Sequence, residues 1–297
     1  MGNETRIPSL YWLNDLLYLM WIGVDRDPGK ASSILMDLTG KVVVITGASR
    51  GIGEALARVF LAEGARVALS SRDLSRLEEA RNRIGITDRT AAVACDVQDR
   101  RQIENLVRAC RDRFGRIDVW INNAGYGMLD SVASMSMEEC RRMFETNLFG
   151  AIECMQAITP LLQAQGAGTI INISSVVGHL PVPYMGAYSA TKHALNAISQ
   201  TARLELEKSG IRVISVCPGR IKTNFGANVV KGNQGKSPLG GRQQGISPER
   251  CARAILKGYL RGTREVFVPW HGFWMSHLYE IFPQAIEFGM RRMMKSR

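Results

Sequence analysis

The chain has 297 residues, of which 45% are hydrophobic and 22% are charged, so it can bury a sizeable core in one large or two modest domains. Its six cysteines are scattered without a close pair or metal-ligand spacing, which argues against a disulfide framework or a zinc site and favours a reducing, cytoplasmic location. The net charge of +11 suits an anionic cofactor, an acidic protein partner, a membrane surface or a solvated basic surface. Nucleic acid is not an expected partner, because no nucleic-acid-binding module is visible and the basic residues are spread along the chain.

An apolar N-terminal extension, residues 1–35, precedes the first predicted strand. Within it, Leu10–Val24 is almost entirely apolar but is shorter than the ~20 residues that a membrane-spanning helix needs. Asp15 would also be costly at the centre of a bilayer. We therefore expect this segment to lie on a membrane surface or to pack against protein.

Seven short runs, most of them rich in valine and isoleucine, are typical of strands buried on both faces of a parallel sheet. They are Lys41–Thr46, Arg66–Ser70, Thr90–Ala94, Ile117–Ile121, Thr169–Ile173, Ile211–Val216 and Glu265–Val268. Helical patterns lie between them, among them Gly53–Glu63, Gln102–Phe114, Met137–Leu162 and Tyr188–Lys208. This alternation predicts a single doubly wound α/β domain over residues 36–270, a Rossmann fold with a mostly seven-stranded parallel sheet.

The first predicted strand runs directly into a glycine-rich turn, Thr46-Gly47-Ala48-Ser49-Arg50-Gly51-Ile52-Gly53. Glycines let the backbone turn tightly and let a pyrophosphate approach the peptide N–H groups. The N-terminus of the following helix adds exposed N–H groups and the positive end of its dipole. Because the turn belongs to the first βαβ unit, it predicts a dinucleotide-binding site.

The end of the second strand indicates which dinucleotide is bound. NAD-binding sites usually place an acid at this point to bind the ribose hydroxyl, but the chain has Ser71 followed by Arg72. Arg50, in the glycine turn, can reach the same region. Two guanidinium groups suit a 2′-phosphate, so we predict NADP(H) rather than NAD.

Tyr188 and Lys192 are four residues apart in a predicted helix and share one face of it. The Lys192 ammonium would favour the phenolate and lower the pKa of Tyr188 from the ~10 of free tyrosine. A phenol tuned in this way can pass a proton to or from a substrate oxygen. The Ser175 hydroxyl, thirteen residues upstream, can hydrogen-bond the same oxygen. Alone the pair is a weak signal, because any helix can carry it by chance.

The segment 224–245 holds six glycines and few apolar side chains, and we interpret it as a loop that closes over the substrate. Ser247-Pro248-Glu249 then predicts a helix start, with serine at the N-cap and proline at the first helical position.

The C-terminal tail, residues 271–297, is aromatic, apolar and basic. Tryptophan and tyrosine favour the lipid headgroup region, and basic residues favour anionic lipids. The tail is typical of a helix that binds a membrane interface. It is equally typical of a segment that packs on the domain or forms an oligomer interface.

These motifs together resemble the short-chain dehydrogenase/reductase family over roughly residues 38–270. The glycine turn has the form TGxxxGxG, Asn122–Gly125 reads NNAG, and Tyr188 and Lys192 form YxxxK. Asn147, Ser175, Tyr188 and Lys192 fall on the catalytic tetrad of the family. The Pro218–Thr223 segment is similar to PGxVxT, with Ile221 in place of valine.

The resemblance implies a role for each matched position. Tyr188 would be the general acid/base, Lys192 would lower its pKa and bind the nicotinamide ribose, Ser175 would hold the substrate oxygen, and Asn147 would hold a relay water. Asp96 would contact the adenine, and Thr223 the nicotinamide carboxamide. The cofactor contacts would come from Gly47, Ser49, Arg50, Gly51, Ile52, Gly53, Ser71, Arg72, Asp96, Val97, Asn123, Ala124, Gly125, Tyr188, Lys192, Pro218, Gly219, Ile221 and Thr223.

We therefore expect an NADP(H)-dependent enzyme that interconverts a ketone and a secondary alcohol by hydride transfer, as a homodimer or homotetramer. The apolar termini favour a steroid-, retinoid- or lipid-like substrate and peripheral membrane association, by analogy with membrane-associated members of the family. One alternative is a 3-oxoacyl-thioester reductase, whose acidic carrier protein the positive charge would attract. Another is a non-catalytic dinucleotide-binding protein.

Overall fold

The computed structural model describes residues 38–227, 229–232 and 245–295. The predicted N-terminal extension, with its apolar run Leu10–Val24, lies outside the described residues. So does most of the loop expected over 224–245, of which residues 224–227, 229–232 and 245 are described.

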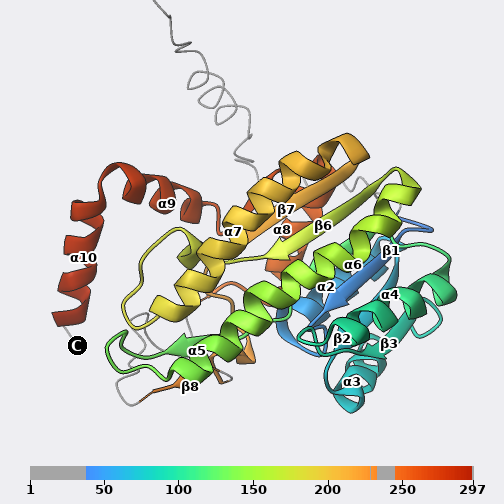
Figure 1. The fold of residues 1–297 in the computed structure, drawn as a ribbon, viewed down its shortest axis with the longest axis horizontal. Helices are drawn as coiled ribbons and strands as arrows, with labels where there is room; N and C mark the ends of the chain where they lie inside the picture. The colour runs from blue at the N-terminus through green and yellow to red at the C-terminus, as the bar shows by residue number, and fades with distance from the viewer. Residues whose placement is uncertain (1–37, 228, 233–244, 296–297) are drawn as a thin grey trace, which may run out of the picture. The chain divides into compact units, whose positions relative to one another are not determined.

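Seven parallel strands form the central sheet, in the spatial order β3-β2-β1-β4-β6-β7-β9 (Figure 1). The strands are β1 (Val42–Thr46), β2 (Arg66–Ser71), β3 (Thr90–Ala94), β4 (Val119–Asn122), β6 (Gly168–Ile173), β7 (Ile211–Pro218) and β9 (Glu265–Val268). The predicted α/β fold and its seven strands are confirmed, with ends that differ by at most two residues. The strand order reverses between β1 and β4, and ligands bind at such a reversal in open α/β sheets.

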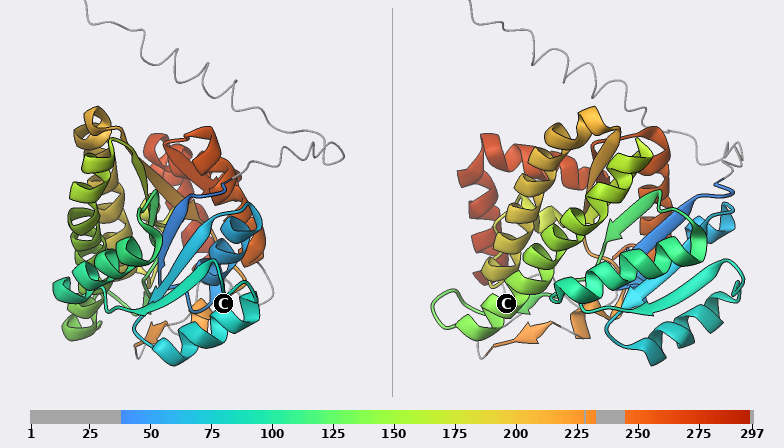
Figure 2. Two further views of the ribbon diagram at one scale, coloured as in Figure 1. Left: turned by 90° about the vertical axis from the view of Figure 1, so that its right-hand side faces the viewer. Right: turned by 45° about the vertical axis from the view of Figure 1, so that its right-hand side comes forward.

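Helices cover both faces of the sheet, because alternate strand residues point to opposite sides (Figure 2). Val43 and Ile45 of β1 pack with α2 (Gly51–Ala62), α3 (Leu74–Ile84) and α8 (Pro248–Arg261). Val42 and Val44 pack on the other face, with α4 (Arg100–Phe114), α6 (Gly150–Gln165) and the end of α7 (Gly186–Leu206). Ser247 caps α8 through the Arg250 N–H and Pro248 begins the helix, as the sequence predicted.

Several short elements were not predicted. The long helical pattern from Met137 consists of α5 (Met137–Phe144), a π-helical turn η1 (Glu145–Phe149) and α6. β5 (Met128–Leu129) and β8 (Val230–Lys231) form a two-stranded parallel sheet of their own. Three short 3₁₀ helices follow: η2 (Val176–Gly178), η3 (Glu207–Ser209) and η4 (Asn224–Ala227).

The C-terminal tail forms two helices, α9 (His271–Ile281) and α10 (Pro283–Lys295). α9 buries Gly272 and Ser276 against the domain, and Phe273 meets Phe267 of β9 edge to face with ring centroids 5.4 Å apart. Within the described part of the chain, every helix is too short or too polar to cross a bilayer.

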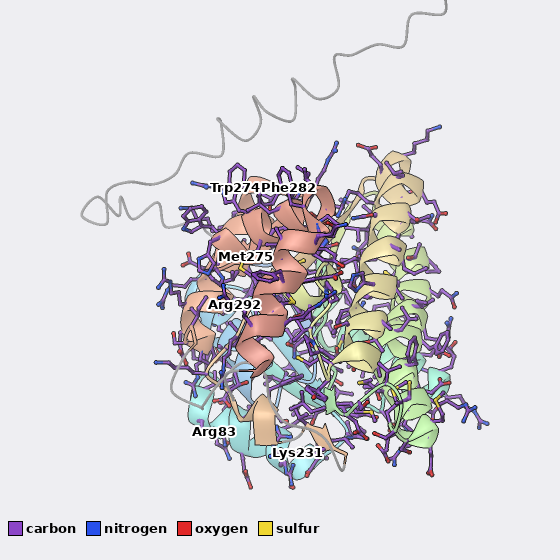
Figure 3. All side chains as sticks on the ribbon, turned by 90° about the vertical axis from the view of Figure 1, so that its left-hand side faces the viewer. Arg83, Lys231, Trp274, Met275, Phe282 and Arg292 are labelled. Atoms are coloured by element: carbon purple, nitrogen blue, oxygen red, sulfur yellow. The ribbon has the colours of Figure 1, made fainter. Side chains whose placement is uncertain are left out.

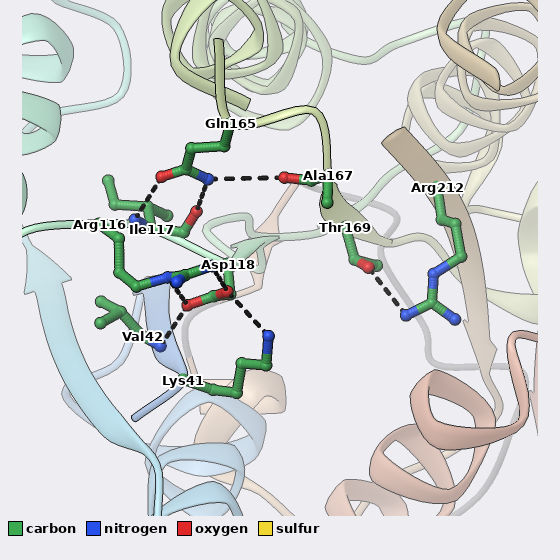
Figure 4. A network of polar contacts seen from close by, with 9 residues as sticks. All are labelled: Lys41, Val42, Arg116, Ile117, Asp118, Gln165, Ala167, Thr169 and Arg212. Carbon is green, nitrogen blue, oxygen red and sulfur yellow. Dashed lines mark hydrogen bonds and ion pairs between the residues drawn. The ribbon is translucent and has the colours of Figure 1, made fainter. Parts of the chain in front are cut away.

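A buried carboxylate, Asp118, ties down the amino edge of the sheet just before β4 (Figure 4). It accepts hydrogen bonds from the backbone N–H of Val42 at 2.9 Å and from the Arg116 guanidinium at 2.7 and 3.0 Å. Lys41 adds an ion pair at 3.2 Å. The carboxylate therefore fixes the starts of β1 and β4 side by side.

Asp118→Ala is expected to lower the free energy of unfolding by about 2 kcal/mol, because it leaves the buried Val42 N–H without an acceptor. Asp118→Asn keeps an acceptor for that N–H and should lose less. Asp112→Ala is the matched control, since Asp112 pairs with Arg111 on the exposed surface of α4 and such pairs contribute little. Urea denaturation gives the three values, and equal losses for Asp118→Ala and Asp112→Ala would contradict the assignment.

Candidate active site

The candidate site lies at the carboxyl edge of the sheet, opposite the Asp118 network. The glycine turn leaves β1 at this edge, Asn123–Gly125 follows β4, and Ser175 follows β6. Pro218 ends β7 at the same edge. Segments far apart in the sequence thus converge where the strand order reverses.

Tight packing shapes the glycine turn. Gly47 and Gly51 have φ values of +64° and +63°, which side chains rarely adopt. A Cβ at Gly47 would lie 2.9 Å from the Cα of Ala124, and one at Gly53 would lie 2.6 Å from the Gly47 carbonyl oxygen. Substitution at these positions would therefore push the turn off the strands beneath it.

The Asn123–Gly125 segment, which follows β4, is hydrogen-bonded to the start of the glycine turn. The Asn123 side-chain Nδ2 donates to the carbonyl oxygens of Thr46 at 2.9 Å and Gly47 at 3.1 Å. The Thr46 hydroxyl accepts from the backbone N–H groups of Asn123 and Ala124, at 3.0 and 3.1 Å. The structure thus uses Asn123 to hold the turn's backbone in shape.

The N-terminus of α2 is open to an anion. Its N-cap residue, Arg50, has an extended backbone, and no side chain of the described residues caps the helix. Burial raises the pKa of Glu54 in the first turn, but hydrogen bonds from Arg83 and Arg58 outweigh it, and the pKa lies below its usual range. An uncapped helix start behind a close-packed glycine turn fits a pyrophosphate.

Cationic side chains gather around this turn. Arg50 and Arg72 are exposed, and the Ser71 hydroxyl donates to the Asp73 carbonyl at 3.2 Å. Arg83 of α3 is an additional cation that the sequence did not indicate. It donates to the Ser49 carbonyl at 3.2 Å and pairs with Glu54 at 2.9 Å. No local motif marks Arg83, because its contact depends on how α3 packs beside α2.

The predicted adenine contact, Asp96, follows β3. Its Oδ1 accepts a hydrogen bond from the Gln98 N–H at 3.1 Å, so this carboxylate oxygen stabilises the turn that follows β3. Val97 packs against Gly150, where an added Cβ would lie 2.6 Å from the Val97 carbonyl oxygen. This close approach brings the start of α6 against the loop after β3.

Asn147 lies in the π-helical turn, a kind of turn that is frequent at functional sites. Its amide bridges the backbone of Tyr126, accepting from the N–H at 3.0 Å and donating to the carbonyl at 2.8 Å. It also donates to the Thr191 hydroxyl at 3.2 Å. A Cβ on Gly125 would lie 2.9 Å from Asn147 Oδ1 and 3.7 Å from Lys192 Nζ. Both groups therefore lie close to Gly125, where a larger residue would push against them.

Lys192 and Tyr188 are both buried on one face of α7. Lys192 Nζ donates to the Ile173 carbonyl at 2.9 Å and lies 5.8 Å from the centroid of the Tyr188 ring. Burial lowers the pKa of Lys192 to about 8. Burial raises the pKa of Tyr188 to about 12, and a hydrogen bond with Ser175 offsets only part of this rise. We had expected the Lys192 ammonium to lower the pKa of Tyr188. In the protein without ligand, burial of the phenol raises this pKa instead.

Ser175 connects the tyrosine to the end of β7. Its hydroxyl donates to the Pro218 carbonyl at 3.2 Å and accepts from the Val177 N–H at 3.3 Å, which caps η2. The Gly219 N–H in turn donates to the Val268 carbonyl at 2.7 Å. The hydroxyl is therefore fixed beside the phenol.

The segment after Gly219 leads back to the glycine turn. Ile221 forms an isolated bridge with Ile246, and an added Cβ on Gly51 would lie 3.3 Å from Thr223 Cγ2. Thr223 is therefore adjacent to the start of α2. The glycine turn, the Pro218–Thr223 segment and the group formed by Ser175, Tyr188, Lys192 and Asn147 therefore gather at the carboxyl edge of the sheet.

Apolar side chains surround Tyr188. They are Met128, Cys140, Met143, Val177 and Ala187, with Tyr126, Met135, Phe144, Val176, Val182, Met185 and Val230 packed against them. The Phe225 ring of η4 is tilted by 54° against the phenol ring, with centroids 5.9 Å apart, and a Cβ added at Gly127 would lie 3.1 Å from it. Among the residues that the structure describes, no cluster of three or more histidine, cysteine, aspartate or glutamate side chains could hold a metal ion.

Comparison with known proteins identifies the family. A family model described as short chain dehydrogenase matches residues 41–234. The chain is 34% identical to a "Dehydrogenase/reductase SDR family protein 7-like" of Anopheles gambiae, over 93% of this chain and 92% of that protein. The chain belongs to the short-chain dehydrogenase/reductase family.

Solved structures of this family agree with the fold. A short-chain dehydrogenase of Burkholderia cenocepacia in complex with NADP has a TM-score of 0.73 and 28% identity, over 86% of this chain and 99% of that one. A 3-ketoacyl-(acyl-carrier-protein) reductase of Brucella melitensis complexed with NADH has a TM-score of 0.70 and 26% identity, over 78% of this chain and 98% of that one. The chain is thus an oxidoreductase of the short-chain dehydrogenase/reductase family, in which neighbours bind either dinucleotide.

Proposed function

We propose that the chain is an NADP(H)-dependent oxidoreductase that interconverts a ketone and a secondary alcohol on an apolar substrate, with Tyr188 as the general acid/base. The convergence of Ser175, Tyr188, Lys192 and Asn147 beside the open start of α2 carries this proposal. A buried proton donor next to a dinucleotide site is the arrangement that carbonyl reduction requires.

The cofactor would supply the hydride, and the protein's residues handle the proton. In reduction, Tyr188 gives its proton to the carbonyl oxygen while the carbonyl carbon receives the hydride. The Ser175 hydroxyl hydrogen-bonds the same oxygen. The Lys192 ammonium stabilises the phenolate that Tyr188 becomes. Asn147 Oδ1 keeps a second lone pair for a water that links Lys192 to solvent.

The residues after β2 support NADP(H) over NAD. Ser71 stands where an acid would bind the ribose hydroxyl, and Arg72 and Arg50 are exposed at the same edge of the sheet. The NADP complex of the Burkholderia neighbour is compatible with this preference, whereas the Brucella neighbour was solved with NADH. The preference therefore rests on the residues of this chain.

The side chains packed around Tyr188 support an apolar substrate, because methionine and aliphatic side chains dominate them. A 3-oxoacyl thioester is the second candidate, supported by the Brucella neighbour and by the net charge of +11, which would attract an acidic carrier protein.

The rate of NADPH oxidation decides between the two substrate classes. We expect turnover with free aryl or steroid ketones, and at least ~10-fold lower kcat/KM with acyl-carrier thioesters, since a carrier arm gains little from an apolar lining. A higher kcat/KM with acyl-carrier thioesters than with ketones would show that the protein is a 3-oxoacyl-thioester reductase. Binding of NADPH without turnover of any carbonyl would favour a non-catalytic protein.

We also propose peripheral membrane association through α9. α9 and its two caps expose an apolar stripe, in which Trp270 is 64% and Ile281 is 67% exposed. The other exposed members are Trp274, Met275, Leu278 and Phe282. Figure 3 shows Trp274, Met275 and Phe282 on one side of the molecule, with Arg292 of α10 nearby. Aromatic side chains with adjacent arginines suit an anionic lipid surface.

The double change Trp274→Ser and Phe282→Ser is expected to weaken binding to phosphatidylserine-containing vesicles by at least ~10-fold, because two large apolar side chains leave the lipid. Leu204→Ser is the control, since Leu204 is an exposed apolar side chain of α7, at 74%, outside the stripe. Vesicle sedimentation and light scattering report binding and oligomer size. Unchanged sedimentation with loss of a homodimer or homotetramer would show that the stripe is an interface between subunits.

A further inference from the structure

His179 links three elements that carry the proposed catalytic groups. It follows η2, whose N-cap is Ser175. Its ring Nε2 lies 3.0 Å from Asn196 Nδ2 and 3.4 Å from Cys217 Sγ. Cys217 directly precedes Pro218, whose carbonyl accepts the Ser175 hydroxyl. The imidazole thus joins the loop after β6, to which it belongs, to the middle of α7 and the end of β7.

Asn196 lies on the same face of α7 as Tyr188 and Lys192, at successive spacings of four residues. η2 sits directly on this face: a Cβ on Gly178 would lie 2.7 Å from Asn196 Nδ2 and 3.0 Å from the Lys192 carbonyl oxygen. The contact between η2 and α7 therefore sets the position of Ser175 relative to the two other catalytic groups.

The hydrogen bonds fix the protonation state of His179. Asn196 Nδ2 donates to the Gly178 carbonyl at 3.0 Å, so the nitrogen side of the amide must face η2. Its second hydrogen then points to His179 Nε2, while Oδ1 has no partner among the described residues. Burial raises the pKa of the Cys217 thiol, which as a neutral group can donate to or accept from Nε2, so the Asn196 amide decides the role of Nε2. Nε2 must therefore accept, and the ring proton lies on Nδ1.

The surroundings agree with a neutral ring. Burial lowers the pKa of His179, and the nearby His193 of α7 and His277 of α9 act in the same direction. Glu265 of β9 and Glu280 of α9 act against it without reversing the shift. Phe267 covers the ring, with centroids 5.5 Å apart.

We propose that His179 is a positioning residue, which as a neutral hydrogen-bond acceptor clamps η2 onto α7 and so holds the Ser175 hydroxyl against Tyr188. The proposal rests on the proposed oxidoreductase function. A proton on Nε2 would set its N–H against the N–H of Asn196 and release η2. The rate of ketone reduction should therefore fall as the pH is lowered and His179 takes up a proton, and this acid limb should lie below the ~6.5 at which an ordinary histidine titrates.

Two substitutions distinguish the role of Nε2 as a hydrogen-bond acceptor from the packing of the imidazole ring. His179→Gln places an acceptor oxygen near the position of Nε2 and cannot titrate in this range, so kcat at neutral pH stays within about threefold of the wild type and the acid limb disappears. His179→Phe keeps a ring on Phe267 but no acceptor, so kcat falls roughly 10-fold or more at every pH, as small misplacements of catalytic groups do. His271→Gln, at an exposed histidine of α9 that is not among the groups acting on the His179 pKa, leaves both the acid limb and kcat unchanged.

Nitrogen NMR of histidine-labelled protein gives a readout that needs no turnover. The His179 signal, assigned from its loss in His179→Gln, is expected to show a neutral ring with an unprotonated Nε2 at pH 7. A proton on Nε2 would overturn the proposal even if the enzyme turned over no ketone. Wild-type kcat in His179→Phe, or an unchanged acid limb in His179→Gln, would also overturn it. Failure of the oxidoreductase function itself appears differently, as a wild-type protein without activity.

Discussion

Tyr188→Phe is expected to lower kcat for ketone reduction by about 10²–10⁴-fold, because it removes the proton donor and nothing else. The phenyl ring keeps its contact with Phe225, so the apolar lining stays in place. The dissociation constant of NADPH should remain within about twofold. Stopped-flow absorbance at the nicotinamide band measures turnover, and protein fluorescence measures binding.

Tyr259→Phe is the matched control for this variant. Tyr259 is a buried tyrosine of α8 that packs in the core on the far face of the sheet, against Phe60. Its substitution should leave kcat unchanged. If Tyr188→Phe and Tyr259→Phe had equal activity, Tyr188 would not be the general acid.

The pH profile tests the partner of Tyr188. Tyr188, with its pKa raised to about 12, stays protonated as an acid across the neutral range. Lys192, with its pKa lowered to about 8, loses its charge as the pH rises through that value and then no longer stabilises the phenolate. The rate of reduction should therefore fall above about pH 8 in the wild type. A rate that keeps rising well above this pH would contradict the role of the Lys192 ammonium.

The double change Arg50→Ala and Arg72→Ala is expected to weaken NADPH binding by about 100-fold, and NADH binding by less than about threefold. Two charge-assisted contacts to a 2′-phosphate account for about 3 kcal/mol, and NADH lacks this group. Isothermal titration with both cofactors measures the two dissociation constants.

Arg108→Ala with Arg111→Ala is the control for net charge, because both arginines are exposed on α4. It should weaken neither cofactor measurably. Equal losses for NADPH and NADH in the Arg50/Arg72 variant would refute the preference for NADP(H). Arg83→Ala tests whether Arg83 binds the 2′-phosphate or only supports the glycine turn. A phosphate contact would weaken NADPH binding alone, whereas support through Ser49 and Glu54 would weaken the binding of both cofactors equally.

The sequence predicted the features that depend on local pattern. Buried parallel strands need continuous apolar runs, so all seven strands of the large sheet were visible. The glycine turn and the start of α8 were visible for a similar reason, since only certain residues tolerate those backbone angles and caps.

Features that depend on packing between distant segments were not visible. The π-helical turn at Asn147 has no local signal, and Arg83 reaches the glycine turn only because α3 packs beside α2. The β5–β8 pair joins two-residue strands about a hundred residues apart, too short to show a period. The Tyr188 pKa depends on burial, which the spacing of Tyr188 and Lys192 does not reveal.

β4 carries structural support at one end and borders the proposed active site at the other. Asp118 anchors its start, and Asn122 ends it next to the segment that holds the glycine turn. A strand rises ~3.3 Å per residue, so these ends lie roughly 13 Å apart, and substitutions at such separations usually have additive effects. Thermal robustness can therefore be engineered at the Asp118 end while substrate preference is evolved around Tyr188, with neither change limiting the other.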